Sequence, residues 1–414
     1  MSVAPGLLTA KCNRAATMKS AIRYILPLAA LAAAASAVPF LAVGDSAELF
    51  VTASAGVSHD DNIFLSTAET EDVVYELSPG AELVVGKNGP SKARVDYKAH
   101  RYVFRDHAVL NRWDSSVVGS ADYVSDDEAT KLRFDAAYSR LSDNTFDLHP
   151  AGSTISRDSI LRRRDIRGAA LADIRVFETD SILVGGSYDY LRYQAPIGVD
   201  QRIVEAPLAY YFRVAPGDQL GLGFRFRNTL LSHGQGANSR DLFYFVGLRG
   251  KLSSNITGTV SVGYLQRDFD HAPGQGTVGV ESSLSYTITE NTQLVGEFSN
   301  DFGTSPTGLA RREMHGSLGL VSQLNNDWST SLKVGYTRAK YLGLQLSNAD
   351  IPSNVRLASF LYSENWYEGT ASLTYSYNTN LSLTAGYTYR RLLSRNSDQE
   401  FADNVFSFSI QLRY

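Results

Sequence analysis

Short runs of strictly alternating apolar and polar residues recur along most of the chain. Residues 406–414 read FSFSIQLRY, residues 381–390 read LSLTAGYTYR and residues 220–227 read LGLGFRFR. Because successive side chains of a β-strand point to opposite faces, each run predicts a strand with one apolar and one polar face. A single strand of this kind fits the edge of a soluble sandwich as well as a membrane barrel. The lengths of the connections between the strands distinguish these two folds.

The lengths of the connections alternate along the chain. We count about 18 strand-like runs after residue 48, each of about ten residues, as expected of membrane barrel strands. Every second connection is a tight turn rich in Asn, Asp, Gly or Ser, which are hairpin residues. These turns lie at residues 88–90, 125–127, 178–180, 216–218, 253–255, 289–291, 325–327 and 378–380. The intervening connections are longer and polar, and the two longest, at about residues 142–162 and 341–364, are candidates for constricting or gating a pore.

Alternating short and long connections are typical of a bacterial outer-membrane barrel, whereas a soluble sandwich or propeller has no reason to alternate them. The pattern therefore predicts an all-β protein: a transmembrane antiparallel β-barrel of about 18 strands, with 16 as the alternative. Its turns would be short on the periplasmic side and its loops long on the extracellular side. A closed barrel also gives every backbone group in lipid an internal partner.

The N-terminus has the layout of a targeting segment. Met18–Arg23 is basic, residues 24–35 are apolar but too short to span a bilayer, and Ala35–Ala37 is a small-x-small cleavage site. The sequence thus predicts a signal peptide over residues 1–37 with its true start at Met18. A short periplasmic lead-in over residues 38–47 and the barrel over residues 48–414 would follow.

Composition agrees with this division. The chain has 23 Tyr and 19 Phe but a single Cys, and aromatic residues favour strands. Its formal net charge of −4 gives no reason to expect a nucleic-acid partner. Cleavage after Ala37 would remove Cys12 together with four cations and no acid, leaving a mature net charge of −8 and no disulfide.

Charged side chains of both signs fall on the polar faces of the predicted strands. Arginines suit carboxylate and phosphate recognition, so an arginine-lined wall would favour anionic solutes. The alternative is that these cations pair with inward-facing acids of neighbouring strands and only solvate the lumen. The candidate lumen or substrate-lining residues are Arg133, Arg163, Arg167, Arg175, Arg225 and Arg227.

The first strand ends in a cluster of acidic and amide residues, Asp60-Asp61-Asn62. Adjacent carboxylates could bind calcium or act as an acid/base pair, but Asp and Asn also simply turn the chain after a strand. The sequence contains no HExxH and no GxSxG motif. We therefore expect a protein that is not an enzyme, with no catalytic residues, no metal and no cofactor. An outer-membrane hydrolase using Asp60, Asp61 or His59 with His107 or His149 is the alternative.

The strand of residues 49–64 with its Asp60-Asp61-Asn62 resembles the start of the outer-membrane family "beta-barrel porin 2", which includes the EpsL-type proteins of exopolysaccharide biosynthesis operons. The apolar positions of the last strand, Phe406, Phe408, Ile410, Leu412 and Tyr414, resemble the signal read by the barrel-assembly machinery, although the usual Gly near its start is absent.

The resemblance implies a porin-like channel in the outer membrane of a Gram-negative bacterium, passing or exporting a hydrophilic solute or exopolysaccharide. Expected partners are outer-membrane lipid and lipopolysaccharide, the assembly machinery, a polysaccharide or anionic solute, and periplasmic export proteins. A non-conducting structural or adhesive barrel is a further alternative.

Overall fold

The computed structural model describes residues 40–43, 46–86, 89–143, 161–194, 198–232, 237–270, 272–342, 363–394 and 400–414. The predicted signal peptide lies outside these ranges. So do nearly all of the loops 142–162 and 341–364, for which gating was predicted.

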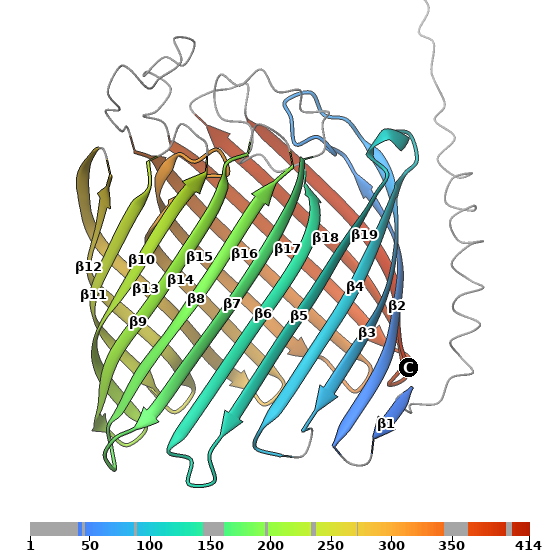
Figure 1. Cartoon of the computed structure of the whole chain (residues 1–414). Coiled ribbons are helices and arrows are strands. Elements are labelled where there is room, and N and C mark those ends of the chain that lie inside the picture. The colour runs from blue at the N-terminus through green and yellow to red at the C-terminus, as the bar shows by residue number, and fades with distance from the viewer. Residues whose placement is uncertain are drawn as a thin grey trace, which may run out of the picture.

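Within the described residues the chain forms a three-residue strand, β1, and eighteen long strands that close into one antiparallel barrel (Figure 1). The first nine are β1 (Leu41–Val43), β2 (Ala47–Asp60), β3 (Asp72–Val85), β4 (Lys92–Phe104), β5 (Arg112–Val124), β6 (Thr130–Asp143), β7 (Leu161–Arg175), β8 (Ser181–Tyr193) and β9 (Asp200–Ala215). The others are β10 (Asp218–Ser232), β11 (Ser239–Gly250), β12 (Ile256–Phe269), β13 (Ala272–Thr289), β14 (Thr292–Thr304), β15 (Ala310–Gln323), β16 (Trp328–Tyr341), β17 (Ser363–Ser376), β18 (Leu381–Ser394) and β19 (Phe401–Arg413).

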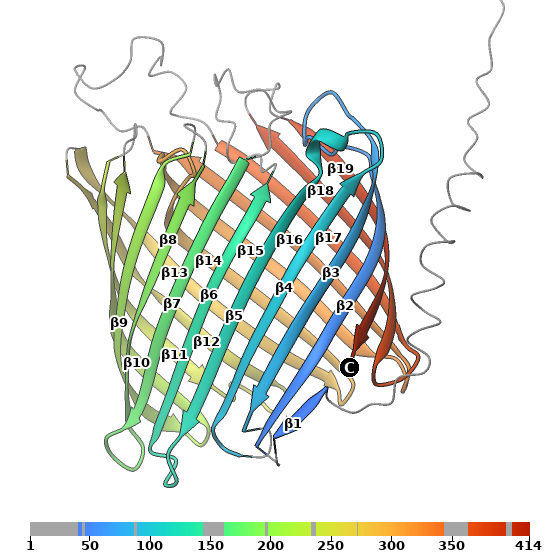
Figure 2. The same ribbon diagram turned by 45° about the vertical axis from the view of Figure 1, so that its right-hand side comes forward.

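The predicted fold class and strand number are confirmed. Each of β2 to β19 pairs antiparallel with its sequence neighbours, and β19 pairs with β2 to close the cylinder. A strand of 14 residues such as β12 spans roughly 46 Å along its own axis, enough to cross a bilayer even when strongly tilted. The strands lie at a steep tilt in both views (Figure 2).

β1 continues the closing seam of the barrel at its lower end. Val51 and Tyr414 exchange two backbone hydrogen bonds, at 2.6 and 2.8 Å. Directly below them, Leu41 of β1 pairs with Leu49 of β2 on the edge that β19 occupies above. The segment expected as a lead-in therefore carries the short strand that extends this edge.

The outer face of the barrel is apolar, as the alternation predicts. Leu222, Val246 and Val262 lie side by side on β10, β11 and β12, and each is about half exposed. On β19, Phe406 and Phe408 also point outward, whereas Ile410 is covered by its outer-face neighbours Leu381 and Leu383. In a membrane protein such outward side chains contact lipid rather than water.

Tight turns join the strands at the end where β1 lies, and the longer connections lie at the opposite end (Figure 1). The predicted alternation of lengths fails at two places on that opposite end, because the β12–β13 and β14–β15 connections are also short. By the convention of outer-membrane barrels, the short-turn end is periplasmic and the loop end extracellular. One of the longer connections contains the 3-10 turn η1 (Ala108–Leu110). Among the described residues, no helix is both long and apolar enough to span a membrane.

Candidate functional site: the lumen and its inner tip

The pairing register shows which side chains face the lumen. On β10, Leu222 and Phe224 are exposed on the outer face, so the alternating Arg225 and Arg227 point inward. Paired residues of antiparallel neighbours share a face, so Glu205, which lies opposite Arg227, also points inward. The inner face of this wall is therefore charged.

The inward arginines of β10 and β12 form one network with four carboxylates. Arg227 donates to Asp241 and to Asp301 at 2.6 to 2.9 Å, and Arg267 donates to Asp241 at 2.6 and 2.8 Å. Arg225 binds Asp301 at 2.8 Å, and it also pairs with Glu205 and Glu281. Arg267 and Asp241 are almost completely buried. Three guanidinium groups thus face four carboxylates, so the network leaves no surplus of positive charge.

The end of the β14–β15 hairpin folds into the barrel. β13 and β14 are paired only up to Val280 and Asn300, whereas β14 and β15 remain paired up to Thr304 and Ala310. Asp301 nevertheless reaches Arg227 across three intervening strands, a separation of roughly 19 Å along a wall of regular spacing. A direct contact over that distance requires residues 301–309, here called the inner tip, to lie on the inner face of the wall.

Backbone contacts fasten the inner tip to the wall. Arg267 donates to the carbonyl of Gly303 and Arg227 to that of Phe302, both at 2.7 Å. The Phe302 ring packs against Phe243 and Leu265, which are buried on the inner face of β11 and β12.

The far end of the inner tip contacts β9 and the connection before it. Gln201 donates to the carbonyl of Ser305 at 2.6 Å, and the backbone N–H of Val199 donates to the carbonyl of Pro306 at 2.8 Å. Ser305 and Gln201 are both buried. The inner tip consequently covers part of the extracellular mouth from β12 round to β9.

The sequence of the inner tip suits a tight inward turn. The Ser305 hydroxyl accepts from the N–H of Leu309 at 3.0 Å and bonds to the hydroxyl of Thr307 at 2.8 Å. Gly308 has φ +83°, a conformation that side chains with a Cβ rarely adopt, and it lies against Val199 and Leu231. The turn is therefore shaped by Gly308 and Ser305.

A further inward arginine, Arg249, joins three strands of the wall near the periplasmic end. Its guanidinium lies 3.9 Å from the centre of the Tyr211 ring and reaches Ser181 at 2.6 Å and Asp173 at 3.0 Å. The ring occupies the space that a side chain at Gly221 would need, since a Cβ there would lie 2.4 Å from it. Arg249 thus connects β11 with β7 and β8.

The register places all six predicted lumen arginines on the inner face, and each has a partner. Besides Arg225 and Arg227, these pairs are Arg133 with Asp135, Arg163 with Asp165, Arg167 with Asp189, and Arg175 with the backbone carbonyl of Glu128. Arg167, Arg225 and Arg227 thus pair with acids of other strands, which is the alternative that the sequence left open. Arg133 and Arg163 pair within their own strands, and Arg175 binds a backbone carbonyl instead of an acid.

Sequence reasoning missed the importance of Asp301, Asp241, Arg267 and Arg249. The connection that carries the inner tip is short, so loop length gave no signal. The combination of Phe302 with a Ser-Pro-Thr-Gly turn was the one hint, because a large apolar residue beside an extracellular turn needs a surface to cover it.

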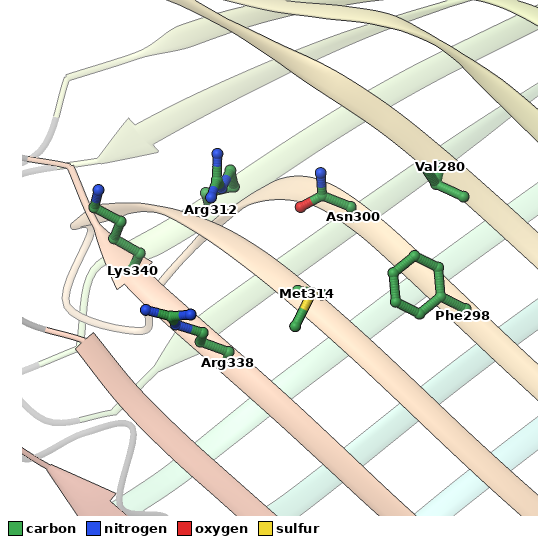
Figure 3. Close-up of a pocket in the computed structure, with 7 residues that line it drawn as sticks. All are labelled: Val280, Phe298, Asn300, Arg312, Met314, Arg338 and Lys340. Atoms are coloured by element: carbon green, nitrogen blue, oxygen red, sulfur yellow. The ribbon is translucent and has the colours of Figure 1, made fainter.

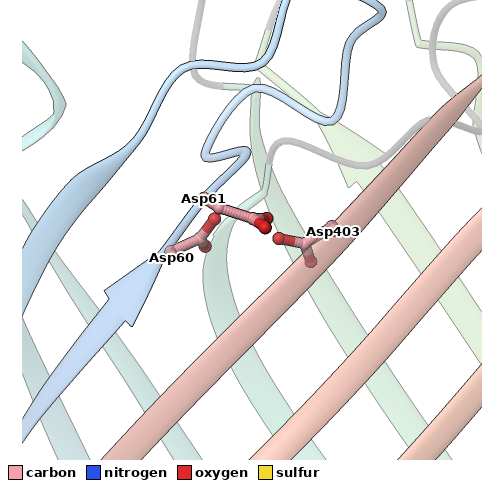
Figure 4. A group of neighbouring side chains, drawn as sticks. All are labelled: Asp60, Asp61 and Asp403. Carbon is pink, nitrogen blue, oxygen red and sulfur yellow. The ribbon is translucent and has the colours of Figure 1, made fainter.

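The Asp60-Asp61-Asn62 cluster lies at the seam between the first and last long strands (Figure 4). Asn62 is fully buried, and its amide donates to the carbonyls of Ser66 and Ala402 at 2.8 Å. The Asp61 carboxylate accepts from the backbone N–H and the side-chain amide of Asn404 at 2.7 and 2.8 Å. These bonds join the loop after β2 to β19.

Asp403 brings a third carboxylate to Asp60 and Asp61, with one oxygen of each within 4.8 Å of the others. Arg390 of β18 binds Asp403 at 2.5 and 2.6 Å, and the N–H of Asn62 donates to Asp60 at 2.9 Å. These hydrogen bonds hold the chain in its turn after β2. Calcium binding by the three carboxylates stays an alternative.

The histidines considered for a hydrolase belong to separate structural pairs. His59 lies 3.8 Å from Glu71. The ring of His107 contacts Asp72 at 2.8 Å, and Asp72 also accepts from the backbone N–H groups of Asp106 and His107. Asp72 thereby anchors the connection before η1. His149 lies outside the described residues.

A closed eighteen-stranded barrel, apolar outside and charged inside, is an outer-membrane β-barrel protein of the bacterial cell envelope. Residues 223–414, which comprise β11 to β19 and most of β10, match the family described as "Putative beta-barrel porin 2", the same family that the sequence resembles. No curated protein matches the chain in sequence.

Solved structures of similar fold are distant. The ferric citrate transporter FecA is 12% identical, with a TM-score of 0.43 over 87% of this chain and 61% of its own. The siderophore receptor PirA from Pseudomonas aeruginosa is 12% identical, with a TM-score of 0.43 over 88% and 80%. The outer membrane protein opdK from Pseudomonas aeruginosa is 12% identical, with a TM-score of 0.43 over 89% and 99%. The chain thus spans less than two thirds of the length of FecA.

Proposed function

We propose that this barrel is a porin-like channel for hydrophilic solutes, and that the inner tip sets the width of its extracellular mouth. The observation that carries the proposal is the charged inner wall together with a hairpin end folded against it. A barrel of 16–18 strands leaves an aqueous channel unless something fills it. Fastened by Arg227 and Arg267, the inner tip narrows this channel at a fixed position.

The paired state of the lumen arginines bears on which solutes pass. Guanidinium groups held by carboxylates, as Arg225 is by Asp301 and Glu281, have little capacity left for a mobile anion. We therefore favour neutral hydrophilic solutes, including an uncharged polysaccharide chain, over the anionic solutes also considered from the sequence. An exopolysaccharide is the finer form of this proposal, and it rests on the resemblance to EpsL-type proteins.

The proposal includes no catalytic role for the barrel. His107 and Asp72 are occupied in anchoring a loop, and Asp61 is held by Asn404. The hydrolase alternative would require these groups to leave those partners. Assembly-machinery and periplasmic export partners belong to the same proposal through the C-terminal strand and the family resemblance.

Planar-bilayer recording of the refolded protein tests the channel. We expect discrete single channels with weak ion selectivity, and transient block by neutral oligosaccharides added on the loop side. Folded protein that inserts without ever conducting would contradict the channel and favour a structural or adhesive barrel. Block by anionic oligosaccharides alone would restore the anionic-solute hypothesis, and turnover of lipase or protease substrates would favour the hydrolase.

A further inference from the structure

A pocket of about 180 Å³ opens on the outer face of the barrel, beside the point where β13 and β14 stop pairing (Figure 3). It is lined from four consecutive strands, β13 to β16. The lining residues are Val280, Phe298, Asn300, Arg312, Met314, Arg338 and Lys340. The separation of the two strands above Val280 creates this hollow, because the β14–β15 hairpin bends inward to form the inner tip.

The outward orientation of the pocket follows from the register. Asn300, Met314 and Arg338 are directly opposite one another on β14, β15 and β16, and Val280 pairs with the exposed Val262. These positions alternate with inward ones such as Asp301. Arg312 is the exception, because the Thr277 hydroxyl that it contacts lies on the inner face, opposite Leu265. The pocket therefore opens to the membrane where β13 and β14 separate, and its Arg312 end reaches through this gap toward the inner face.

Three basic side chains gather at one end of the pocket. Arg312 and Lys340 are cross-strand partners, with Arg338 two residues along β16 from Lys340. Arg312 donates to the Thr277 hydroxyl at 3.3 Å, and within the described ranges none of the three basic groups makes an ion pair with a carboxylate. Like charges directly opposite one another destabilise a strand pair unless an anion lies between them.

The pocket is polar toward the loops and apolar toward the membrane interior. Lys340 and Arg312 lie next to the extracellular ends of β16 and β15, whereas Phe298 and Val280 lie further down the wall (Figure 3). A ligand that fits must therefore carry a negative group above and a hydrocarbon chain below. The outer leaflet of the bacterial outer membrane is the compartment that this face contacts.

We propose that this pocket binds a phosphorylated glycolipid of the outer leaflet, the lipid A part of lipopolysaccharide. Its phosphate lies among Arg312, Arg338 and Lys340, which donate charge-assisted hydrogen bonds. An acyl chain follows Phe298 and Met314 down the wall. This lipid neutralises the facing cations Arg312 and Lys340. It thereby stabilises the β14–β15 hairpin at the point where the hairpin bends inward to form the inner tip.

The test measures binding of bis-phosphorylated lipid A to the refolded, detergent-solubilised full barrel by native mass spectrometry, with bound molecules counted per barrel. The variants are Arg312→Gln, Arg338→Gln, Lys340→Gln and the triple combination. A matched control removes three lumen-facing cations instead, by Lys92→Gln, Lys98→Gln and Lys333→Gln. Each variant is first checked for the heat-dependent gel shift of a folded barrel.

We expect each single substitution to weaken binding about fivefold and the triple variant on the order of 100-fold, so that one bound lipid A is lost per barrel. The lumen control keeps the wild-type count. Dephosphorylated lipid A should bind this site as weakly as lipid A binds the triple variant. If the folded single variants and the triple variant all retain the wild-type count, the site assignment is wrong. If inorganic phosphate or a phosphorylated oligosaccharide without acyl chains displaces the lipid at equal concentration, the pocket recognises free phosphate and not a lipid.

Discussion

Arg227 of β10 and Asp301 of β14 form a two-pronged ion pair, at 2.9 and 2.8 Å, although three strands lie between them in the sheet. Their contact joins the inner tip to the barrel wall. Because both side chains are shielded from bulk water, the loss of one partner leaves a poorly solvated charge. If the inner tip sets the width of the mouth, as proposed, that width depends on this pair.

Replacing Asp301 with Ala should release the inner tip. Arg225 and Arg227 both lose a carboxylate, and breaking a buried pair in this way costs about 3 kcal/mol. We expect larger and noisier single channels with the barrel still folded, measured in planar bilayers. Glu297→Ala is the control, since Glu297 is an inward acid of the same strand whose bond is a 3.2 Å contact from Ser317. Equal conductance of Asp301→Ala and wild type would show that the inner tip does not limit the current.

Gly308 offers an independent way to disturb the inner tip without removing charge. A Cβ at this position would lie 3.3 Å from Val199 Cγ2, and φ +83° costs a non-glycine residue roughly 1–2 kcal/mol. Gly308→Ala should therefore increase current fluctuations in the same direction as Asp301→Ala. Gly369→Ala on the outer face of β17 is the matched control, because a Cβ there meets nothing within 4 Å. If Gly308→Ala and Gly369→Ala give the same current fluctuations, the conformation of Gly308 does not hold the inner tip in place.

A pair of neighbouring positions on β12 tests which face contacts lipid. Val262 points outward and Ser261 inward, opposite Gly247 and Glu281. Val262→Arg should destabilise the bilayer-inserted barrel by about 2–4 kcal/mol, as measured by denaturant unfolding in vesicles. Ser261→Arg should cost little because the new cation lies beside Glu281 in an aqueous lumen. Similar losses for the two variants would contradict the assignment of the faces.

The strands could be predicted from the sequence because alternation is a local property. The runs at residues 381–390 and 406–414 fall within β18 and β19, and the tight turns fall at the periplasmic end. The membrane and the closed barrel impose this alternation on almost every strand, so the pattern remains readable residue by residue.

The contents of the lumen could not be predicted in the same way. Arg225 is bound by acids 56 and 76 residues further along the chain. The second of these contacts, with Asp301, exists only because the hairpin end bends inward. The sequence located the arginines on the correct face but could not pair them. The predicted gating loops lie almost wholly outside the described residues, so gating by those loops stays a prediction, whereas a short connection supplies the inner tip.

Asn62 should be the most sensitive residue of the barrel seam. Its buried side chain bonds to the carbonyls of Ser66 and Ala402 and accepts from the N–H of Ser66 at 3.0 Å. Asn62→Ala leaves these backbone groups unpaired, and we expect a loss of about 3 kcal/mol. The measurement is the urea midpoint of barrel unfolding, with Asn326→Ala in an exposed periplasmic turn as the control.

The position of Asn62 also predicts which part of the barrel unfolds first in the Asn62→Ala variant. Because Ala402 belongs to β19, the loss of this bond weakens the contact between the first and last long strands more than any internal hairpin. Hydrogen exchange should then rise first along β2 and β19 in Asn62→Ala, with β10 to β12 unchanged. A uniform rise over all strands would mean that the seam is not a separate weak point, and an unchanged urea midpoint would mean that Asn62 only shapes its loop.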